Sequence, residues 1–219
     1  MKTITYAITA CNELEEIQRL ISFLKKHKRD VDNIFILWDE KNGSEEVWEY
    51  LEHQIEEDCN ISYSSFNGNF ANWKNYMNSY CRGDIIFNLD ADELPHENLI
   101  KSLPKLIKIN PNVDLFWVPR INTLEEDTQE NILNYIKSQK WVINSKNHIN
   151  SPDYQGRIYK NNPNIKWEGK VHEKIIGYKN YTRLPISEEY SIFHPKTLER
   201  QINQNLSYEK YSRNSFNTN

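Results

Sequence analysis

The chain has 219 residues, of which 26% are charged, and a formal net charge of -4 at pH 7. A chain of this length can bury a core of its own, so we expect a single domain. The acidic balance argues against a general nucleic-acid binder, which needs a basic face to meet phosphates. The 3 cysteines (Cys11, Cys59 and Cys81) have no metal-ligand spacing, which is typical of proteins in a reducing compartment.

The chain starts directly with a strand-like run over residues 3–9, without the basic and then apolar pattern of a signal peptide. No stretch approaches the ~20 consecutive apolar residues of a membrane span. We therefore expect a cytoplasmic protein without a transmembrane segment.

Apolar runs and segments of helical periodicity alternate in the first half of the chain. The expected strands are residues 3–10, 33–38, 61–64 and 84–89, and the expected helices are residues 14–27, a segment through 47–51, 70–81 and 97–109. Asn12 is placed to cap the first helix. This alternation predicts an α/β fold with a mostly parallel sheet and helices on both faces.

The second half of the chain follows a different pattern. The expected strands are residues 113–120, 155–160, 165–174 and 190–193, with a weak helix over 130–138. The turn 161–164 is expected to join the second and third of these strands as a pair. A polar helix from Lys196 should close the fold, followed by a tail after Arg213 that we expect to fray.

Residues 83–93, GDIIFNLDADE, combine an apolar run with carboxylates at its end. This pattern predicts a buried strand whose C-terminal tip opens into solvent. Because side chains alternate along a strand, Asp90 and Asp92 are expected to point the same way. Two like charges there favour a divalent cation with oxygen ligands, Mg2+ or Mn2+, which could in turn hold a diphosphate. The alternative is that the acids only cap the next helix.

Other acidic residues follow neighbouring strands of the expected sheet. Glu13 comes after the first strand and Asp39 ends the second. Ligands of parallel sheets bind at the C-terminal ends of the strands, so one crevice could collect these residues with Asp90 and Asp92. The chain has no Gly-rich phosphate loop, so a nucleotide would be bound by other means.

Several short motifs occur in a specific order along the chain. They are residues 11–13 (CNE), 38–40 (WDE), 73–75 (WKN) and 89–93 (LDADE). In this order they resemble the nucleotide-sugar glycosyltransferases of A-type (GT-A) fold, in particular the inverting family two. Residues 167–173 (WEGKVHE) and the segment around His194 resemble its branch that includes lipopolysaccharide-core β-glycosyltransferases.

The resemblance implies one GT-A domain in three parts. Residues 1–110 would form the nucleotide-sugar-binding half, residues 111–195 a smaller mixed β acceptor half, and residues 196–219 the C-terminal helix and tail. It also implies that Thr9, Asn12 and Glu13 lie by the nucleoside.

Asp39 is implied to accept a hydrogen bond from the base, commonly uracil. The second strand ends in residues 39–44, DEKNGS, rather than in the family's commoner Asp-rich turn, which leaves the base open.

The resemblance also implies a site for the diphosphate and a metal. Lys74 would lie near the diphosphate, Asp90 would contact the ribose or the metal, and Asp92 would bind the metal directly. His194 would complete the metal or phosphate site. Arg157 would either reach the donor or acceptor or bridge strands.

The resemblance therefore implies a metal-dependent glycosyltransferase. It would move a sugar from a nucleoside-diphosphate sugar, a UDP-sugar by resemblance, to a hydroxyl of a glycan, lipid or protein, with inversion. The attacking hydroxyl needs a general base, for which we expect Glu173, with His172 and Asp153 as alternatives. Glu173 could instead form a plain ion pair with Lys174 or Arg157.

Two other classes remain open from the sequence. A metal-dependent sugar nucleotidyltransferase can share such a sheet and acidic pair, but it usually carries a Gly-rich basic loop after the first strand. A non-catalytic carbohydrate-binding module could use the 6 Trp and 13 Tyr residues, which stack well on sugars. Glu93 is expected to be structural in any of these classes, accepting backbone hydrogen bonds at its turn.

Overall fold

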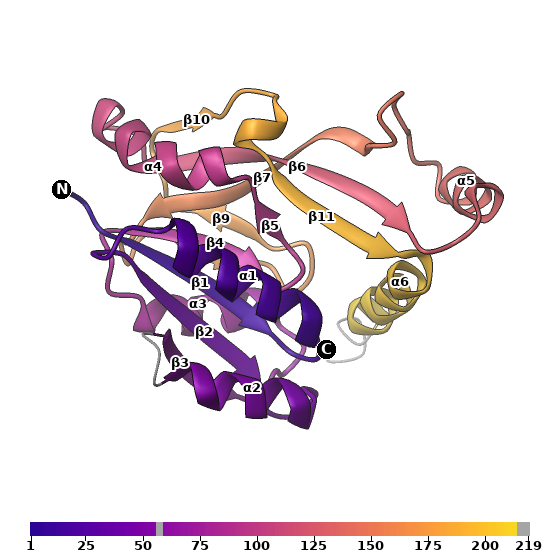
Figure 1. Cartoon of the computed structure of the whole chain (residues 1–219), viewed down its shortest axis with the longest axis horizontal. Helices are drawn as coiled ribbons and strands as arrows, with labels where there is room; N and C mark the ends of the chain where they lie inside the picture. Colours follow the sequence, from indigo (N-terminus) through magenta and orange to yellow (C-terminus); the bar gives the residue numbers. More distant parts are fainter. Residues whose placement is uncertain (56–58, 214–219) are drawn as a thin grey trace.

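The computed structural model describes residues 1–55 and 59–213. A nine-stranded sheet runs through it in the order β3-β2-β1-β4-β7-β6-β11-β5, with β10 paired to β6 (Figure 1). The strands β1 (Ile4–Ala10), β2 (Asn33–Asp39), β3 (Cys59–Ser64) and β4 (Ile85–Asp90) are parallel to one another. The predicted α/β fold with a mostly parallel sheet is confirmed.

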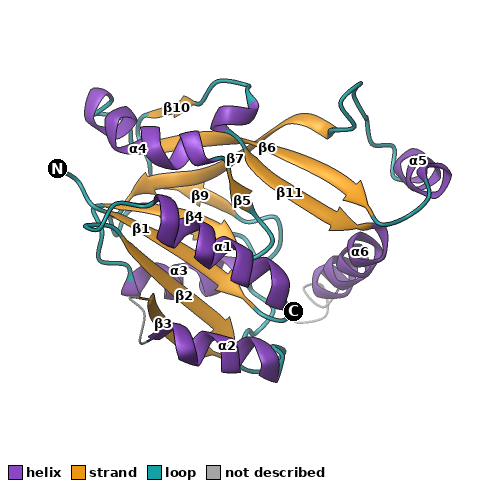
Figure 2. Ribbon diagram, viewed as in Figure 1, coloured by secondary structure: helices purple, strands orange, loops and turns teal. Residues whose placement is uncertain are grey.

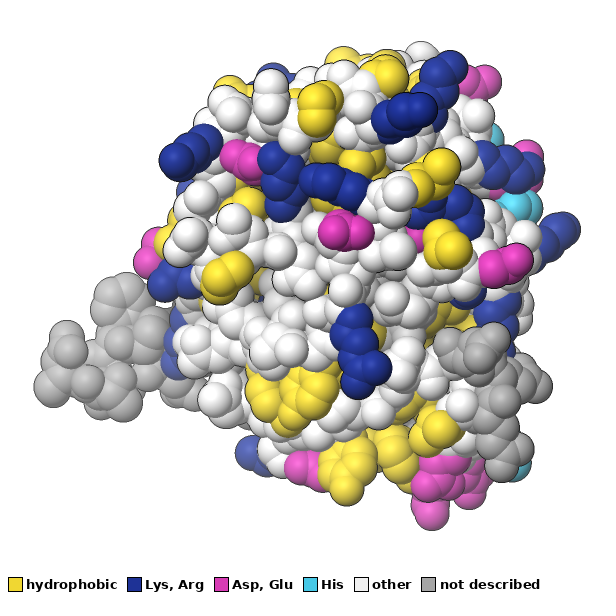
Figure 3. Space-filling view, turned by 90° about the vertical axis from the view of Figure 1, so that its left-hand side faces the viewer, with side chains coloured by type: hydrophobic (Ala, Val, Ile, Leu, Met, Phe, Trp, Pro, Cys, Tyr) yellow, Lys and Arg dark blue, Asp and Glu magenta, His cyan; other side chains and the backbone are white. Residues whose placement is uncertain are grey.

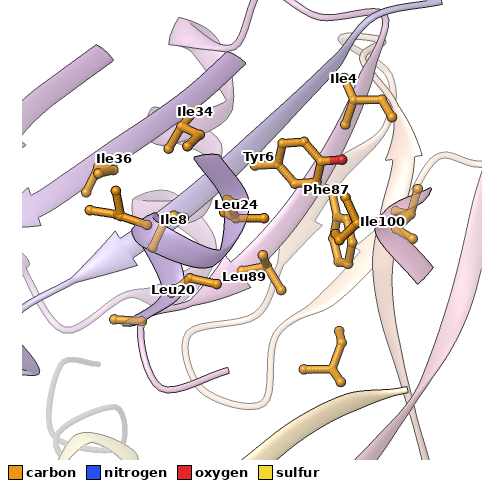
Figure 4. Close-up of a cluster of buried hydrophobic side chains, with 14 of the residues drawn as sticks. Ile4, Tyr6, Ile8, Leu20, Leu24, Ile34, Ile36, Phe87, Leu89 and Ile100 are labelled. Atoms are coloured by element: carbon orange, nitrogen blue, oxygen red, sulfur yellow. The ribbon is translucent and has the colours of Figure 1, made fainter. Parts of the chain in front are cut away.

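Helices cover both faces of the parallel part of the sheet (Figure 2). Because side chains alternate along β1, Tyr6 and Ile8 pack on the face that carries α1 (Leu14–His27), α2 (Glu45–Ile55) and α4 (Glu97–Ile109). Figure 4 shows this cluster, in which Leu20 and Leu24 of α1 meet the strands. Ala7 packs on the other face, against α3 (Phe70–Tyr80).

The turn before α1 differs from the prediction. Glu13, not Asn12, precedes the helix, and no side chain caps it. The Glu13 carboxylate turns back instead and accepts hydrogen bonds from the backbone N–H groups of Cys11 (2.8 Å) and Asn12 (3.1 Å). The CNE motif therefore forms a closed turn at the end of β1.

The second half of the chain extends the same sheet. Strand β7 (Ile149–Lys160) is antiparallel to both β4 and β6 (Leu115–Glu125), and β11 (Ile192–Thr197) is parallel to β6. The remaining elements are β5 (Leu94–Pro95), α5 (Gln129–Ser138), β8 (Lys166–Glu168), β9 (Lys174–Ile176), β10 (Tyr181–Arg183), the short 3-10 helix η1 (Glu188–Tyr190) and α6 (Leu198–Arg213). The two halves therefore share one sheet.

The predicted strand over residues 165–174 is wrong. The chain reverses there, so that β8 and β9 form an antiparallel hairpin of their own, and β7 pairs with β4 and β6 instead. Gly169 (φ +104°) and His172 (φ +57°) adopt left-handed backbone conformations that an extended strand does not allow.

The C-terminal helix begins at Leu198 rather than at Lys196, because Lys196 and Thr197 continue the pairing of β11 with β6. Of the apolar residues in this helix, Leu198 is buried, whereas Ile202 and Leu206 are exposed. Polar contacts attach α6 to the rest of the protein, such as the hydrogen bond from Asn205 to the Tyr135 hydroxyl (2.8 Å). The tail expected to fray lies outside the described residues.

The end of the molecule that faces the viewer in Figure 3 lies away from the C-terminal ends of the parallel strands. Basic, acidic and hydrophobic side chains are interspersed on it, without a continuous basic surface. Across residues 1–55 and 59–213, no helix combines the length and the apolar character needed to cross a bilayer.

Candidate active site

The expected acidic residues gather at the C-terminal ends of β1, β2 and β4. β4 ends at Asp90, and Asp92 lies in the turn that follows, so the alternation of a strand does not extend to it. The two carboxylates consequently have different partners: Asp90 pairs with Lys74 and Arg157, whereas Asp92 pairs with residues of β11 and α6. Strand alternation therefore gives no account of how Asp92 is oriented, although the charge of Asp90 still raises the pKa of Asp92.

Asp90 is the centre of the first cluster of side chains. Its Oδ1 accepts a hydrogen bond from the Thr9 hydroxyl (3.0 Å), and its Oδ2 accepts one from Arg157 (2.8 Å). The Lys74 ammonium lies 3.5 Å from Oδ1. Although burial raises the pKa of Asp90, the charges of Arg157 and Lys74 outweigh it and hold this pKa well below its usual range.

Lys74 joins this cluster to Glu173. The Lys74 Nζ lies 2.8 Å from the Glu173 carboxylate and 4.6 Å from the centre of the Trp167 ring. The loop that contains Glu173 and His172 connects β8 to β9. Of the two readings of Glu173, the structure shows an ion pair, but with Lys74 rather than with Lys174 or Arg157.

Arg157 and Glu93 both contact Asp90 and are buried. Arg157 bonds to both Asp90 and Glu93, and Arg120 lies 3.1 Å from the same Glu93 oxygen. Burial lowers the pKa of Arg157, but Asp90 and Glu93 raise it by more, so this buried guanidinium stays charged. Glu93 also accepts the backbone N–H of Asp90 (3.2 Å), which confirms its predicted structural role. Arg157 therefore bridges β7 to the β4 turn.

Asp92 is the centre of a second cluster. His194 Nε2 and Lys196 Nζ each lie 3.4 Å from its Oδ2, and Arg200 lies 4.0 Å away. Burial raises the pKa of Asp92, but His194 and Lys196 hold it well below the usual range. Sequence reasoning missed Lys196 and Arg200. The spacing of Lys196 two residues after His194 could have revealed it, because such residues share one face of a strand.

His194 is connected to β7 through Asn122. Its Nδ1 lies 2.8 Å from Asn122 Oδ1, and Asn122 Nδ2 donates to Asp153 Oδ2 (2.9 Å). Arg120 pairs with the same Asp153 oxygen at 2.8 Å, and Gln155 donates to the other oxygen at 2.6 Å. Both oxygens of Asp153, an alternative for the general base, thus accept hydrogen bonds from neighbouring side chains.

The residues expected near the nucleoside are at the tips of β1 and β2. Glu13 lies 3.2 Å from Arg200, and burial raises the pKa of its carboxyl group. Asp39 is buried and accepts hydrogen bonds from the backbone N–H groups of Lys41 (3.1 Å) and Phe66 (3.1 Å). Its Oδ2 accepts a bond from the Asn42 side chain (2.7 Å). Asp39 therefore shapes the turn after β2.

Asp92 and His194 are better suited than Asp90 to hold a divalent cation. Within the described part of the chain, no group of three or more His, Cys, Asp or Glu side chains is arranged to hold a metal ion. Asp90 has both oxygens bonded to Thr9 and Arg157. Two ligands bound about 2.1 Å from one ion lie about 3 Å apart, close to the 3.4 Å between Asp92 Oδ2 and His194 Nε2.

A cavity of about 290 Å³ opens beside the second cluster. It lies between the start of α1, the ends of β6 and β11, and the start of α6. Its lining residues include Glu16, Arg19, Glu125, Lys196 and Arg200. Lys196 and Arg200 thus face both Asp92 and this cavity.

A mostly parallel sheet whose C-terminal edge gathers acids, cations and a histidine is the arrangement expected of a GT-A glycosyltransferase. A family model described as glycosyl transferase family 2 matches residues 5–175, and the chain belongs to this family. This match confirms that the chain is a member of glycosyltransferase family two, as the resemblance predicted. A comparison with curated protein sequences finds no significant match.

Solved structures of S. aureus TarS share the fold. TarS 1–349 is 12% identical with a TM-score of 0.60, and the match covers 89% of this chain and 60% of that one. TarS 1–349 in complex with UDP-GlcNAc gives a TM-score of 0.59 at 12% identity and covers 90% and 59%. The present chain therefore spans about 60% of the TarS fragment.

Proposed function

We propose that the protein is a metal-dependent glycosyltransferase that moves a sugar from a nucleoside-diphosphate sugar to a hydroxyl acceptor. The observation that carries this proposal is the approach of His194 Nε2 to Asp92 Oδ2 at the C-terminal edge of the parallel strands. Mn2+ or Mg2+ is the cation that we expect Asp92 and His194 to hold, with Asp90 as a neighbour. When bound, it would neutralise charge on the departing diphosphate.

The surrounding cations would assist the same leaving group. Lys74 and Lys196 are buried ammonium groups, each within 3.5 Å of one of the two aspartates. Buried cations at fixed positions stabilise developing negative charge more than solvated ones, because water does not screen them. Lys74 would also contact the diphosphate as the family resemblance implies, and Arg157 would act by holding Asp90 rather than by touching the donor.

The donor nucleoside would bind at the tips of β1 and β2. Thr9, Asn12 and Glu13 border this position, and Asp39 Oδ2 has a second lone pair for a base N–H besides its bond to Asn42. A uracil base and a hexosyl donor are our proposals, supported by TarS complexes with UDP and UDP-GlcNAc.

Glu173 remains our candidate for the general base. A carboxylate that accepts a proton from an acceptor hydroxyl must lie within hydrogen-bond reach of it. Glu173 is on the loop between β8 and β9, and its side chain is 14% exposed beside Lys74. Transfer with inversion to a glycan, lipid or protein hydroxyl follows from a single displacement with such a base. Similarity to the lipopolysaccharide-core branch and a cytoplasmic location are further proposals.

The experiment is a panel of nucleotide sugars with and without Mn2+, scoring release of nucleoside diphosphate and thermal stabilisation. We expect release with one donor, only with the metal, and its loss in Asp92→Asn. Asp84→Asn is the matched control, because Asp84 precedes β4 and is exposed at the opposite end of the same strand. Full release in the presence of EDTA, or in Asp92→Asn, would overturn metal dependence. Release of pyrophosphate from a nucleoside triphosphate and a sugar phosphate would indicate a nucleotidyltransferase instead, and no release at all a binding module.

A further inference from the structure

The hydrogen bonds around Asn122 determine which nitrogen of His194 carries a proton. Asn122 on β6 and His194 on β11 are direct partners in the parallel pairing of the two strands. Their side chains meet at 2.8 Å, between Asn122 Oδ1 and His194 Nδ1. On its other side, Asn122 meets the Asp153 carboxylate at 2.9 Å.

Asp153 dictates the orientation of the Asn122 amide. Burial raises the pKa of Asp153, but the charge of Arg120 and the hydrogen bond from Asn122 lower it by more, so this carboxylate stays ionised. An ionised carboxylate can only accept hydrogen bonds. The NH2 group of Asn122 must therefore face Asp153, which leaves its carbonyl oxygen to face His194. The reverse orientation would place two acceptor oxygens against each other in a half-buried site.

The Asn122 carbonyl in turn dictates the protonation of the imidazole ring. A carbonyl oxygen only accepts, so His194 Nδ1 must carry the hydrogen. In the neutral ring the lone pair then belongs to Nε2, the atom that lies 3.4 Å from Asp92 Oδ2. Asp92 is itself an ionised carboxylate that only accepts, and a hydrogen bond from His194 helps to keep its pKa low. Either a proton or a cation therefore lies between Nε2 and Asp92, while Nδ1 keeps its hydrogen in both cases. An outer partner that fixes a ring in this way is what a metal-binding histidine requires.

We propose that Asn122, held by Asp153, is a positioning residue that keeps a hydrogen on Nδ1 of His194, so that Nε2 is the ring nitrogen left to share a cation with Asp92. The consequence for metal binding rests on the proposed function, whereas the tautomer itself does not. Asn122 touches neither the donor nor the cation in this proposal.

The first readout is the tautomer of His194 in the metal-free protein. Nitrogen-15 NMR of the histidine rings at pH ~9, where imidazole is neutral, distinguishes the two ring nitrogens, and His194→Gln assigns the signal. We expect a hydrogen on Nδ1 in the wild type and a shift toward Nε2–H in Asn122→Leu, because the carbonyl acceptor at Nδ1 is then gone while Asp92 still accepts at Nε2. Nε2–H without a hydrogen on Nδ1 in the wild type would overturn the proposal.

The second readout is Mn2+ affinity, measured by titration with electron paramagnetic resonance. We expect Asn122→Leu to bind Mn2+ about 10- to 100-fold more weakly, the range typical for loss of an outer partner of a metal ligand. The double variant Asn122→Asp/Asp153→Asn exchanges the carboxylate and the amide, so an acceptor still faces His194 Nδ1. It should keep both the tautomer and the affinity within a few-fold of the wild type.

Thr123→Val is the matched control, because the Thr123 hydroxyl on the same strand donates to the exposed Glu125 instead. An Asn122→Leu protein with unchanged tautomer and affinity would overturn the proposal. The same would follow if the exchanged pair lost the Nδ1–H tautomer. A wild type that shows Nδ1–H but binds no divalent cation would support the positioning role and overturn the metal dependence of the proposed function.

Discussion

Lys74 is a buried cation between two carboxylates. Its ammonium lies 2.8 Å from Glu173 and 3.5 Å from Asp90, and its side chain is 6% exposed. Asp90 keeps Arg157 as a second partner, but Glu173 has no other ion-pair partner within the described residues. Removing the cation would therefore leave the Glu173 charge largely uncompensated next to Trp167.

We expect Lys74→Met to lower the free energy of unfolding by about 3 kcal/mol, because breaking one side of a buried ion pair leaves the other charge unpaired. Urea denaturation at neutral pH measures this. Lys101→Met is the control, since the pair of Lys101 with Glu97 is exposed on one face of α4 and its loss should not be measurable. Equal urea midpoints for Lys74→Met and the wild type would contradict the argument that the buried Glu173 charge depends on Lys74.

Glu173 lies on the loop that joins β8 to β9, and this hairpin places it beside Lys74 of α3. Asn75 of α3 bonds twice to the backbone of Trp167, donating to its carbonyl and accepting its N–H, each at 2.8 Å. Gly177 ends the hairpin with φ +82°, and a Cβ there would lie 1.7 Å from the Asn164 carbonyl oxygen. The close approach of these two backbone segments requires glycine.

We expect Gly177→Ala to displace the hairpin, with a cost of about 1–3 kcal/mol for the strained backbone and faster hydrogen exchange over residues 166–176. Gly156→Ala is the matched control on β7, because its added Cβ would meet Ile175 and Leu115 at 3.4 Å and its φ is not in the left-handed region. Hydrogen exchange followed by mass spectrometry compares the protection of residues 166–176 in the two variants. Equal protection of the hairpin in both variants would contradict the role of Gly177.

The elements that sequence reasoning predicted well are those with local signals. α1 and α4 have the expected bounds, because apolar residues at helical spacing specify a buried face without help from distant residues. The hairpin and the full length of β11 were missed. Their conformation depends on what they pack against: β11 continues to Thr197 because β6 continues beside it to Glu125.

At the scale of the whole molecule, the two halves share one sheet and one core. β4 pairs with β7 of the second half, and the core around Tyr6 also contains Phe116, Ile158 and Ile192. A fragment ending at residue 110 would expose this core and turn β4 into an open edge strand, which favours aggregation.

We therefore expect residues 1–110 expressed alone to lack a cooperative thermal transition, whereas the full chain unfolds in one. Circular dichroism and calorimetry measure the thermal unfolding of the fragment and of the full chain. A sharp transition of the fragment would contradict the common core and would make the nucleotide-binding half an independent unit.

The candidate site could be predicted from the sequence only where its residues lie next to a strand end. Asp90 and Asp92 follow an apolar run directly, so their position was evident. Asn122 and Arg200 reach the site through the order of the strands, and Asn122 lies 72 residues before His194. No local pattern marks such residues, because only the topology brings them together.

The pairing of β6 with β11 limits how this protein can change in length. Since Asn122 and His194 face each other through strand register, deleting one residue inside β11 would turn the imidazole to the opposite side of the sheet. The connection between β10 and β11 is held at Leu184 and Ser191, which are buried, but residues 185–189 between them are mostly exposed and can absorb insertions. Homologues and engineered variants should accordingly differ in length within residues 185–189 and keep a constant spacing from Ile192 to Thr197.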